Sequence, residues 1–345
     1  MESGYTGIPP FQTVTIMRIA VFDTKNYDRQ SLDEANRQFG HQLSYFEPRL
    51  NRDTLDLVHD VDAVCPFVND RLDAEVIASL AQRGVRLITL RCAGFNGVDV
   101  TACRQHGITV TRVPAYSPHA VAEHAFALLL AVVRRIHKSY VRVREMDFSL
   151  DGLVGFDLYR KTMGVVGTGR IGQAAIAIAK GFGMRVLAFD VYPQHGLDQQ
   201  LGFEYVTLER LLAECDVVSL HLPLTAETQH MINGTSLAGM KSGAVLINTS
   251  RGGLVETGAL ITALKDGRLA GVGLDVYEME EGVFFENHSE VGLQDDQLAR
   301  LLTFPNVLVT AHQGFLTREA LDNIAETTLA NATAFEQGQA LGNQV

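Results

Sequence analysis

The stretch MGVVGTGRIGQAAIAIAKGFG (163–183) decides the fold of this chain. It begins with an apolar run typical of a buried strand, continues through Gly167, Gly169 and Gly172 in the spacing G-x-G-x-x-G, and ends in a helical pattern. An acidic residue, Asp190, ends the next apolar run. The glycine spacing alone is a weak signal, but this full context predicts a strand–loop–helix unit that binds a dinucleotide.

Each part of the motif has its own physical task. Gly167 permits a tight turn, Gly169 has no Cβ and so lets a pyrophosphate approach the backbone, and Gly172 lets the helix pack close to the strand. The backbone N–H groups at the start of the helix, near Arg170 and Ile171, point towards phosphate groups. We therefore expect these residues to line a phosphate-binding loop.

Asp190 discriminates between the two nicotinamide dinucleotides. Its carboxylate can accept hydrogen bonds from both ribose hydroxyls, whereas it would repel a 2′-phosphate. The residues that follow, Val191 and Tyr192, carry no cation that would bind such a phosphate. The sequence therefore predicts NAD (as NADH) rather than NADP.

Short apolar, β-branched runs alternate with helical patterns on both sides of this stretch, which is the rhythm of parallel βαβ units. The expected strands before it are residues 18–22, 42–46, 62–67, 85–90 and 108–113, with helices that include 72–82 and 99–105. The expected strands from it onward are residues 163–168, 185–190, 216–222, 244–249, 269–276 and 306–311. The sequence thus predicts an α/β protein with two doubly wound parallel sheets.

A helical pattern separates the two series of strands. Ser117 suits the N-cap position and Pro118 the first helical position, and the pattern continues to about Met146. We expect one helix of roughly thirty residues here, a structural spine between two domains. A last helix is expected over 317–336, where apolar spacing suggests that it packs back on the first domain.

These patterns predict a discontinuous first domain and a continuous second one. The expected substrate (catalytic) domain is flavodoxin-like and comprises residues 17–116 and 316–345. The expected NAD-binding domain is of the Rossmann type and comprises residues 117–315, with a cleft between the two. Residues 1–16 have neither a basic segment nor an apolar segment of a signal peptide, and we expect a disordered extension there.

The composition excludes several classes of function. Of the 345 residues, 46% are apolar and 20% charged, as in globular proteins with a sizeable core, and the net charge of −11 offers no basic face to a nucleic acid. The most apolar helical run, 125–133, is too short to span a membrane. The cysteines are scattered and are expected to be reduced thiols of a cytoplasmic protein: Cys65, Cys92, Cys103 and Cys215.

Chemically useful side chains follow three strands of the second series. Arg251 follows 244–249, Glu278 and Glu280 follow 269–276, and His312 follows 306–311. Taken singly, Arg251 could be a solvated turn residue, the glutamates part of an acidic loop, and His312 a capping residue. Because ligands bind beyond the carboxyl ends of strands in open α/β sheets, their joint occurrence at one edge favours a catalytic site. No metal site is expected, since His119 and His124 lack the spacing of a zinc motif.

Several stretches from near Met17 to the C-terminus match motifs of one enzyme family. They are RCAGFNGVD (91–99), RVPAYSPHAVAEHA (112–125), VVGTGRIG (165–172), SLHLPLT (219–225), NTSRGG (248–253), GLDVYEMEEGVFFE (273–286) and AHQGFLT (311–317). The chain resembles the NAD-dependent D-2-hydroxyacid dehydrogenases, and specifically the bacterial fermentative D-lactate dehydrogenases. The resemblance implies reversible reduction of pyruvate to D-lactate with NADH.

The resemblance also implies a catalytic trio. His312 is expected to be the acid and base, because histidine exchanges a proton near working pH, and Glu280 to keep that histidine charged. Arg251 is expected to hold the substrate carboxylate in its planar fork. Within the acidic loop, the family's pattern falls on Glu280, with Glu278 the second candidate and Glu281 a third.

Further contacts follow from the same match. Backbone N–H groups of Ala93 and Gly94 are expected to bind the substrate carboxylate, and Tyr116 and Phe315 to line its pocket. The expected contacts to the nicotinamide and its ribose are Leu222, Pro223, Thr228, Thr249, Ser250 and Asp275. Thr228 departs from the family, whose members often have asparagine there, and Asp275 alternatively only ends its strand.

Two other functions stay open. A reductase of a larger 2-keto acid, such as 2-ketoisocaproate, remains an alternative, although the bulky pair Phe315–Leu316 favours the methyl group of pyruvate. The other is an NAD-sensing interaction protein on the same fold, which the complete trio argues against. We expect a homo-oligomer, a dimer or a tetramer, in which the spine helix suits the interface.

Overall fold

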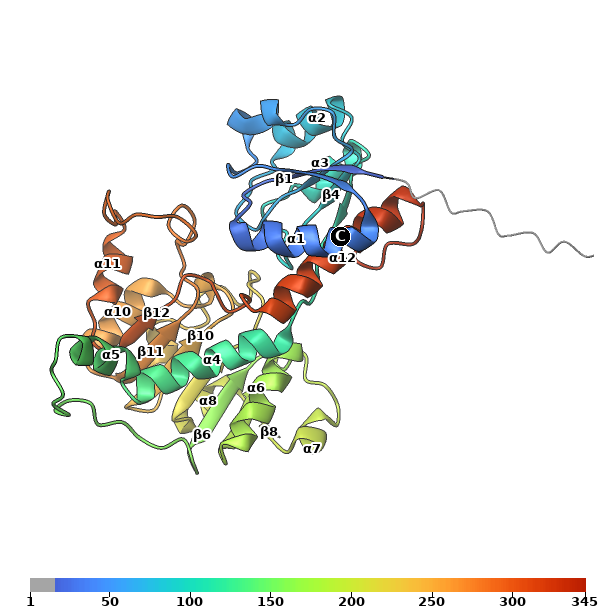
Figure 1. Ribbon diagram of the computed structural model, residues 1–345. Coiled ribbons are helices and arrows are strands. Elements are labelled where there is room, and N and C mark those ends of the chain that lie inside the picture. Colours follow the sequence, from blue (N-terminus) through green and yellow to red (C-terminus); the bar gives the residue numbers. More distant parts are fainter. Residues whose placement is uncertain (1–15) are drawn as a thin grey trace, which may run out of the picture. The chain divides into compact units, whose positions relative to one another are not determined.

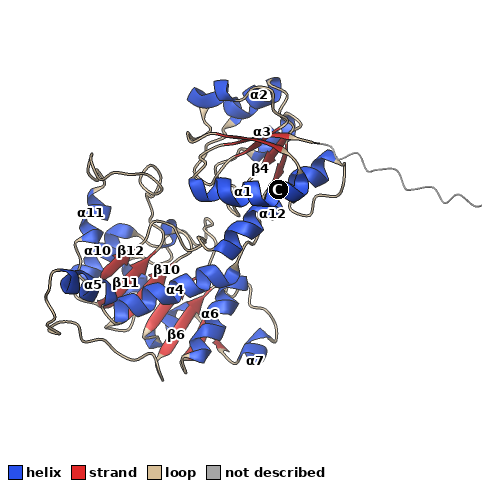
Figure 2. Cartoon of the chain, in the orientation of Figure 1, coloured by secondary structure: helices blue, strands red, loops and turns tan. Residues whose placement is uncertain are grey.

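The computed structural model describes residues 16–345, which divide into two compact units (Figures 1 and 2). Unit 1 comprises the described residues up to Tyr116 together with Arg318–Val345, and unit 2 comprises Ser117–Thr317. The extension expected over residues 1–16 lies outside the described residues, except for Ile16. No helix of the described part is both long and apolar enough to cross a membrane.

Unit 1 is built on a five-stranded parallel sheet in the order β2-β1-β3-β4-β5, which is the flavodoxin-like order. Its elements are β1 (Arg18–Val21), α1 (Asn26–Phe39), β2 (Gln42–Tyr45), the 3-10 helix η1 (Arg52–Leu57), β3 (Ala63–Cys65), α2 (Ala74–Gln82), β4 (Leu87–Thr89), α3 (Val100–Gln105), β5 (Thr109–Thr111) and α12 (Arg318–Glu336). Figure 1 shows α1 and α12 on one side of this sheet and α2 and α3 on the other.

The last helix belongs to unit 1 because its apolar stripe fits the sheet there. Ala325 and Leu329 of α12 are buried in one cluster with Leu32 of α1 and Ile19 of β1. Beyond α12 the chain reaches β5, where the N–H of Val345 donates to the carbonyl oxygen of Val110 at 3.0 Å. Both the first strand and the end of the chain therefore contribute to unit 1.

Unit 2 is built on a seven-stranded parallel sheet in the order β12-β11-β10-β9-β6-β7-β8. Its elements are α4 (Pro118–Val133), α5 (Ile136–Arg144), β6 (Thr162–Val166), α6 (Arg170–Gly181), β7 (Arg185–Phe189), α7 (Leu197–Leu201), β8 (Glu204–Tyr205), α8 (Leu208–Glu214), β9 (Val217–Leu220), α9 (Gly234–Gly239), β10 (Ala244–Asn248), the 3-10 helix η2 (Gly252–Leu254), α10 (Thr257–Lys265), β11 (Leu269–Leu274), α11 (Asp296–Leu302) and β12 (Val307–Val309). The two sheets confirm the predicted fold class.

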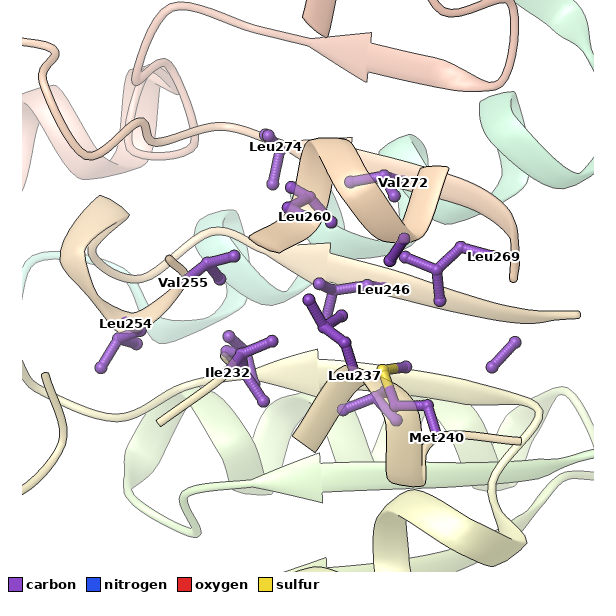
Figure 3. Close-up of a cluster of buried hydrophobic side chains, with 14 of the residues drawn as sticks. Ile232, Leu237, Met240, Leu246, Leu254, Val255, Leu260, Leu269, Val272 and Leu274 are labelled. Carbon is purple, nitrogen blue, oxygen red and sulfur yellow. The ribbon is translucent and has the colours of Figure 1, made fainter. Parts of the chain in front are cut away.

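Helices cover both faces of the unit 2 sheet, so its strands are apolar on both sides. In β10, Val245 and Ile247 face the cluster that includes α4 and α6, while Leu246 faces the cluster that includes α8, α9, α10 and α11. Figure 3 shows part of this second cluster, with Leu246 of the sheet beneath Leu260 of α10. The strand exits are thereby fixed by packing on two sides.

The predicted spine helix is wrong in one respect. It is not one helix from Ser117 to Met146, because α4 ends at Val133 and α5 begins at Ile136. Between them Arg135 adopts left-handed backbone angles, with φ 54° and ψ 31°, which ends the regular helical hydrogen bonding. The Arg135 guanidinium donates to the carbonyl oxygen of Ala270 at 3.3 Å. Neither glycine nor proline marks the break, so the apolar period continues through it in the sequence.

The strand predictions were accurate in position and too generous in length. Each predicted strand ends one or two residues earlier in the structure than expected, because the residues after each strand form the exits to loops. The second series also has one strand more than predicted. This strand, β8, has only two residues and pairs with the edge strand β7, so it leaves almost no period-two pattern.

The close approach of α4 to β11 gives a test of the fold. A Cβ on Gly271 would lie 2.2 Å from Cγ1 of Val132, so Gly271→Ala should lower the free energy of unfolding by about 1–3 kcal/mol. Val132→Ala should cost less in that background than alone, because it removes the clashing methyl group. Gly258→Ala, which has open space around it, is the control and should not destabilise. Urea unfolding measures the free energy of unfolding of the two single variants, the double variant and the control. Strictly additive effects of Gly271→Ala and Val132→Ala would contradict the packing.

Candidate active site

The candidate site lies at the carboxyl edge of the unit 2 sheet. The strand order reverses between β6 and β9, which is the point where doubly wound sheets bind ligands. The glycine loop follows β6, Leu222 follows β9, Arg251 follows β10, and the acidic loop and His312 follow β11 and β12. Because all these strands are parallel, the predicted residues of unit 2 are delivered to one edge.

The glycine loop has the geometry that the sequence predicts. Gly167 has φ 101°, and a Cβ there would lie 2.6 Å from the carbonyl oxygen of His221. A Cβ on Gly172 would lie 1.9 Å from the carbonyl oxygen of Gly167, so only glycine allows the helix to start so close to the strand. A Cβ on Gly169 would meet nothing within 4 Å. The loop is therefore tight on the protein side and open at Gly169.

The N-terminus of α6 can receive an anion. Its N-cap, Gly169, provides no side-chain acceptor, and the helix begins with the predicted Arg170 and Ile171. The first backbone N–H groups of a helix have no intrahelical acceptors and carry the positive end of the helix dipole. A diphosphate fits this end of the helix, as it does in other sheets of this type.

Asp190 is held against the glycine loop. Its Oδ2 accepts hydrogen bonds from the backbone N–H of Thr168 at 2.6 Å and from the Thr168 hydroxyl at 2.8 Å, and its Oδ1 accepts the N–H of Tyr192 at 2.9 Å. A carboxylate has about four acceptor sites, so room remains for a further hydroxyl donor such as a ribose. That Asp190 accepts hydrogen bonds from both ribose hydroxyls stays a prediction, with three of its acceptor positions already engaged within the protein.

A cavity of about 660 Å³ lies beside Asp190. Its walls come from the ends of β7 and β8 and the start of α8, and include Phe189, Pro193, Val206, Leu208 and Arg210. The cavity is mostly apolar, and Asp190 is one of its lining residues. A flat aromatic base attached to the ribose fits such a place.

The residues that follow β9 and β10 approach the glycine loop. A Cβ on Gly167 would lie 3.0 Å from Cδ2 of Leu222, and the Ser250 hydroxyl donates to the carbonyl oxygen of Leu222. The Thr249 hydroxyl is buried and has no hydrogen-bond partner among the described residues. A buried hydroxyl of this kind suits a polar ligand group, so the residues present fit a nicotinamide dinucleotide.

Two of the predicted cofactor contacts have other partners. The Thr228 hydroxyl donates to the carbonyl oxygen of Pro223 at 2.8 Å and accepts the N–H of Thr225 at 2.8 Å. It therefore shapes the turn that presents Pro223, which is exposed. The other residue is Asp275, which is only 1% exposed.

The Asp275 carboxylate holds the segment that carries His312. It accepts the Thr310 hydroxyl at 2.6 Å and the backbone N–H groups of Gln313 at 2.8 Å and Gly314 at 2.7 Å. His124 Nε2 lies 3.2 Å from the same carboxylate. Burial opposes ionisation of Asp275, but the hydrogen bonds from His124 and Thr310 outweigh it, and the pKa lies below its usual value. An anionic Asp275 thus orders the His312 loop.

His312 and Glu280 form a direct pair. Nδ1 of His312 lies 2.8 Å from Oε1 of Glu280, and Oε2 of Glu280 accepts the backbone N–H of Tyr277 at 3.0 Å. The Phe285 ring lies 5.8 Å from the imidazole, centroid to centroid. The His312 backbone has a left-handed φ of 53°, and its N–H donates to the carbonyl oxygen of Asp275 at 2.7 Å. The ring is therefore oriented through Nδ1, which leaves Nε2 for another partner.

The second candidate, Glu278, does not contact His312. It pairs with His230, whose Nε2 lies 2.5 Å from its Oε1, and it accepts hydrogen bonds from Thr257. Of the two candidates that the sequence left open, Glu280 is therefore the one that pairs with His312, and its catalytic role stays a prediction. His230 was not identified from the sequence, because a histidine in a turn has no distinguishing spacing.

Arg251 leaves β10 in a loop that is fixed at its backbone. Asn248 Nδ2 donates to the carbonyl oxygen of Arg251 at 2.9 Å, and the Arg251 guanidinium donates to the carbonyl oxygen of Ser250 at 2.7 Å. No carboxylate within residues 16–345 forms an ion pair with Arg251, which is partly exposed. Most of its planar fork is therefore available to an anion.

The remaining predicted substrate contacts are divided between the units. Ala93 and Gly94 follow β4 in unit 1, and neither backbone N–H has an acceptor in the described part of the chain. Arg112 donates to the carbonyl oxygen of Ala93 at 3.0 Å, which orients this turn. Tyr116 also belongs to unit 1, where its carbonyl oxygen accepts Asn323 Nδ2 at 2.8 Å.

Phe315 belongs to unit 2, where it is buried three residues beyond His312. His221, at the exit of β9, hydrogen-bonds Ser219 through Nε2 at 2.9 Å. Burial lowers the pKa of His221 to about 4, so this histidine stays neutral near neutral pH.

The comparisons with known proteins agree with this geometry. Residues 126–314 match the model of the D-isomer specific 2-hydroxyacid dehydrogenase, NAD binding domain. The D-lactate dehydrogenase of Escherichia coli (strain K12) is 48% identical over 329 residues, which cover 95% of this chain and 100% of that protein.

Two solved structures are also similar over nearly the whole chain. The pyruvate reductase of Chlamydomonas reinhardtii has a TM-score of 0.91 and 45% identity and covers 96% of this chain and 99% of its own. The D-lactate dehydrogenase from Aquifex aeolicus complexed with NAD and lactic acid has a TM-score of 0.83 and 36% identity. The match covers 95% of this chain and 98% of that one. The chain therefore belongs to the NAD-dependent D-isomer specific 2-hydroxyacid dehydrogenases.

Proposed function

We propose that this protein is a D-lactate dehydrogenase, which reduces pyruvate to D-lactate reversibly. The observation that carries the proposal is the His312–Glu280 pair at 2.8 Å, at the sheet edge that also carries Arg251 and the glycine loop. The D-lactate dehydrogenases and the pyruvate reductase to which the chain is similar support this substrate. We further propose that unit 1 is the substrate domain.

The reaction requires a hydride at C2 of pyruvate and a proton at the keto oxygen. Bound NADH supplies the hydride. Protonated His312 donates a proton from Nε2, because Nδ1 is engaged by Glu280. The negative charge of Glu280 stabilises the imidazolium before the transfer, and the hydrogen bond keeps the ring oriented. In the reverse direction, neutral His312 accepts the hydroxyl proton of D-lactate.

Arg251 and the turn after β4 bind the substrate carboxylate in this proposal. The guanidinium can make two parallel hydrogen bonds to a carboxylate, which fixes the plane of the substrate. The N–H groups of Ala93 and Gly94 supply further donors from unit 1. Tyr116 and Phe315 line the space for the side chain, which in pyruvate is a methyl group.

The first test is turnover of the purified protein. With pyruvate it should oxidise NADH and form D-lactate. The rate with NADH should be higher for pyruvate than for 2-ketoisocaproate, and the rate with pyruvate should be far higher for NADH than for NADPH. His312→Gln should lose on the order of 10²–10⁴-fold in kcat and keep near-normal NADH affinity, because the variant lacks the proton donor only. Absence of turnover with every short 2-keto acid would refute the proposal. A matching loss of NADH binding would make His312 structural.

The second test concerns the partner of His312. Glu280→Gln should lower the kcat of pyruvate reduction on the order of 10–100-fold with near-normal NADH affinity, because the imidazole loses the carboxylate that orients its ring. Steady-state kinetics and NADH titration measure this. Glu278→Gln leaves the His312 pair intact and should keep kcat close to that of the parent. An unchanged kcat in Glu280→Gln would count against the role of Glu280.

We also propose a homo-oligomer formed through α5 and the segment that follows it. This apolar arm, residues 136–159, exposes Tyr140, Met146, Phe148, Leu150, Val154 and Tyr159, with exposed fractions from 62% to 88%. Several exposed apolar side chains along one segment favour a contact with another protein surface. A second copy is the occupant we favour. The four buried free cysteines fit a cytoplasmic location.

The interface can be tested by changing its charge. Phe148→Asp combined with Val154→Asp should convert the oligomer to a monomer, because two charges would be buried in an apolar interface. Light scattering after size exclusion measures the mass. Leu302→Asp, at an exposed apolar position on α11, is the control and should leave the mass unchanged. An intact oligomer in the double variant would exclude the arm as the interface.

A further inference from the structure

A second histidine–carboxylate group lies beside the catalytic pair. Oε1 of Glu278 lies 2.5 Å from Nε2 of His230, and Oε2 accepts the backbone N–H of Thr257 at 3.1 Å and its hydroxyl at 2.9 Å. Burial disfavours the charged carboxylate, but the hydrogen bonds from His230 and Thr257 outweigh this, so the pKa of Glu278 lies below its usual value. The mechanism above gives none of these three residues a task.

The three residues come from three separate segments. His230 lies in the turn after β9, Thr257 is the first residue of α10, and Glu278 lies in the loop after β11. The N-cap residue of α10, Glu256, makes no side-chain capping bond, so Glu278 caps this helix from another loop. A single carboxylate thus joins the turn, the helix start and the acidic loop.

Two of these segments carry the catalytic side chains. Glu280 lies two residues after Glu278 in the acidic loop, and Arg251 precedes Thr257 in the loop that leads into α10. The two loops touch, since a Cβ on Gly252 would lie 2.0 Å from the carbonyl carbon of Tyr277. The Glu278 hydrogen bonds therefore span the contact between the loop of Arg251 and the loop of Glu280.

The turn of His230 also holds the Arg251 loop through its backbone. The N–H of His230 donates to the carbonyl oxygen of Gly253 at 2.8 Å, and the N–H of Ile232 donates to the carbonyl oxygen of Leu254 at 3.0 Å. Figure 3 shows Ile232 next to Leu254 and Val255 in the apolar cluster below. Apolar contacts stabilise the Arg251 loop but are not directional. The hydrogen bonds of Glu278 are directional and so can set its orientation.

We propose that His230, Glu278 and Thr257 are positioning residues, a tie that sets Arg251 relative to Glu280 and His312 for binding of the substrate carboxylate. The inference rests on the proposed function, because it takes Arg251 as the group that binds the carboxylate. Bidentate binding demands a fixed orientation, and a small misplacement of a binding group is costly to the reaction. The tie should therefore act on substrate affinity and not on proton transfer or cofactor binding.

The test uses Glu278→Gln in the full-length protein. The amide keeps the size of the side chain but cannot accept hydrogen bonds on both atoms and carries no charge. The KM for pyruvate should rise about tenfold, and so should the dissociation constant of oxamate, which has pyruvate's carboxylate and carbonyl. The kcat and the KM for NADH should change by less than about threefold.

Matched variants separate the tie from general effects at the same place. Glu256→Gln removes a charge from the same helix start without breaking a side-chain bond, and should leave the KM for pyruvate unchanged. Thr257→Ser keeps the donors and should behave like the parent, whereas Thr257→Val should raise the KM. The double variant His230→Gln with Glu278→Gln should have a KM for pyruvate no higher than that of the more impaired single variant. Both substitutions break the same tie, so their effects should not add.

Each outcome is decisive when the unfolding midpoint is measured alongside. A raised KM and weaker oxamate binding with near-normal kcat support the tie. A lower midpoint and a smaller active fraction, with KM and oxamate affinity unchanged, would make these residues merely structural and overturn it. Independent, additive effects of the two substitutions would also overturn it. If the parent protein neither reduced pyruvate nor bound oxamate, the proposed function would fall and the tie with it.

Discussion

Parallel pairing of the unit 2 strands is the constraint on which the site depends. In a parallel sheet every strand ends at the same edge, so residues that are far apart in the chain become neighbours if each follows a strand. The glycine loop, Arg251 and His312 all follow strands of this sheet. Two apolar clusters, one on each face, keep those strand ends in place.

Buried and half-buried carboxylates then orient the groups at that edge. Asp275 orders the loop of His312, Glu280 orients its ring, and Glu278 joins the neighbouring segments. Each carboxylate accepts several directional bonds, so each limits the movement of a loop that has little regular structure of its own. Unit 2 therefore combines apolar packing under the sheet with a polar network above its edge.

Much of this arrangement could be predicted from the sequence, because its signals are local. The glycine spacing depends on close approaches at Gly167 and Gly172 that no other residue permits, and the strands alternate with helices at regular intervals. The break at Arg135 could not be predicted, because its left-handed backbone lies in a continuous apolar pattern. The hydrogen bond between Glu278 and His230 could not be predicted either, since it joins residues 48 positions apart.

The partition of the chain bears on how such an enzyme can change over time. The chain passes from unit 1 to unit 2 only after Tyr116 and returns only at Arg318, so residues 117–317 form one uninterrupted cassette. Crossovers at these two junctions would transfer the glycine loop, Asp190 and His312 together. The backbone donors at Ala93 and Gly94 would stay behind. The residues Asp190 and His312 can therefore be inherited as one block, while unit 1 diversifies by itself.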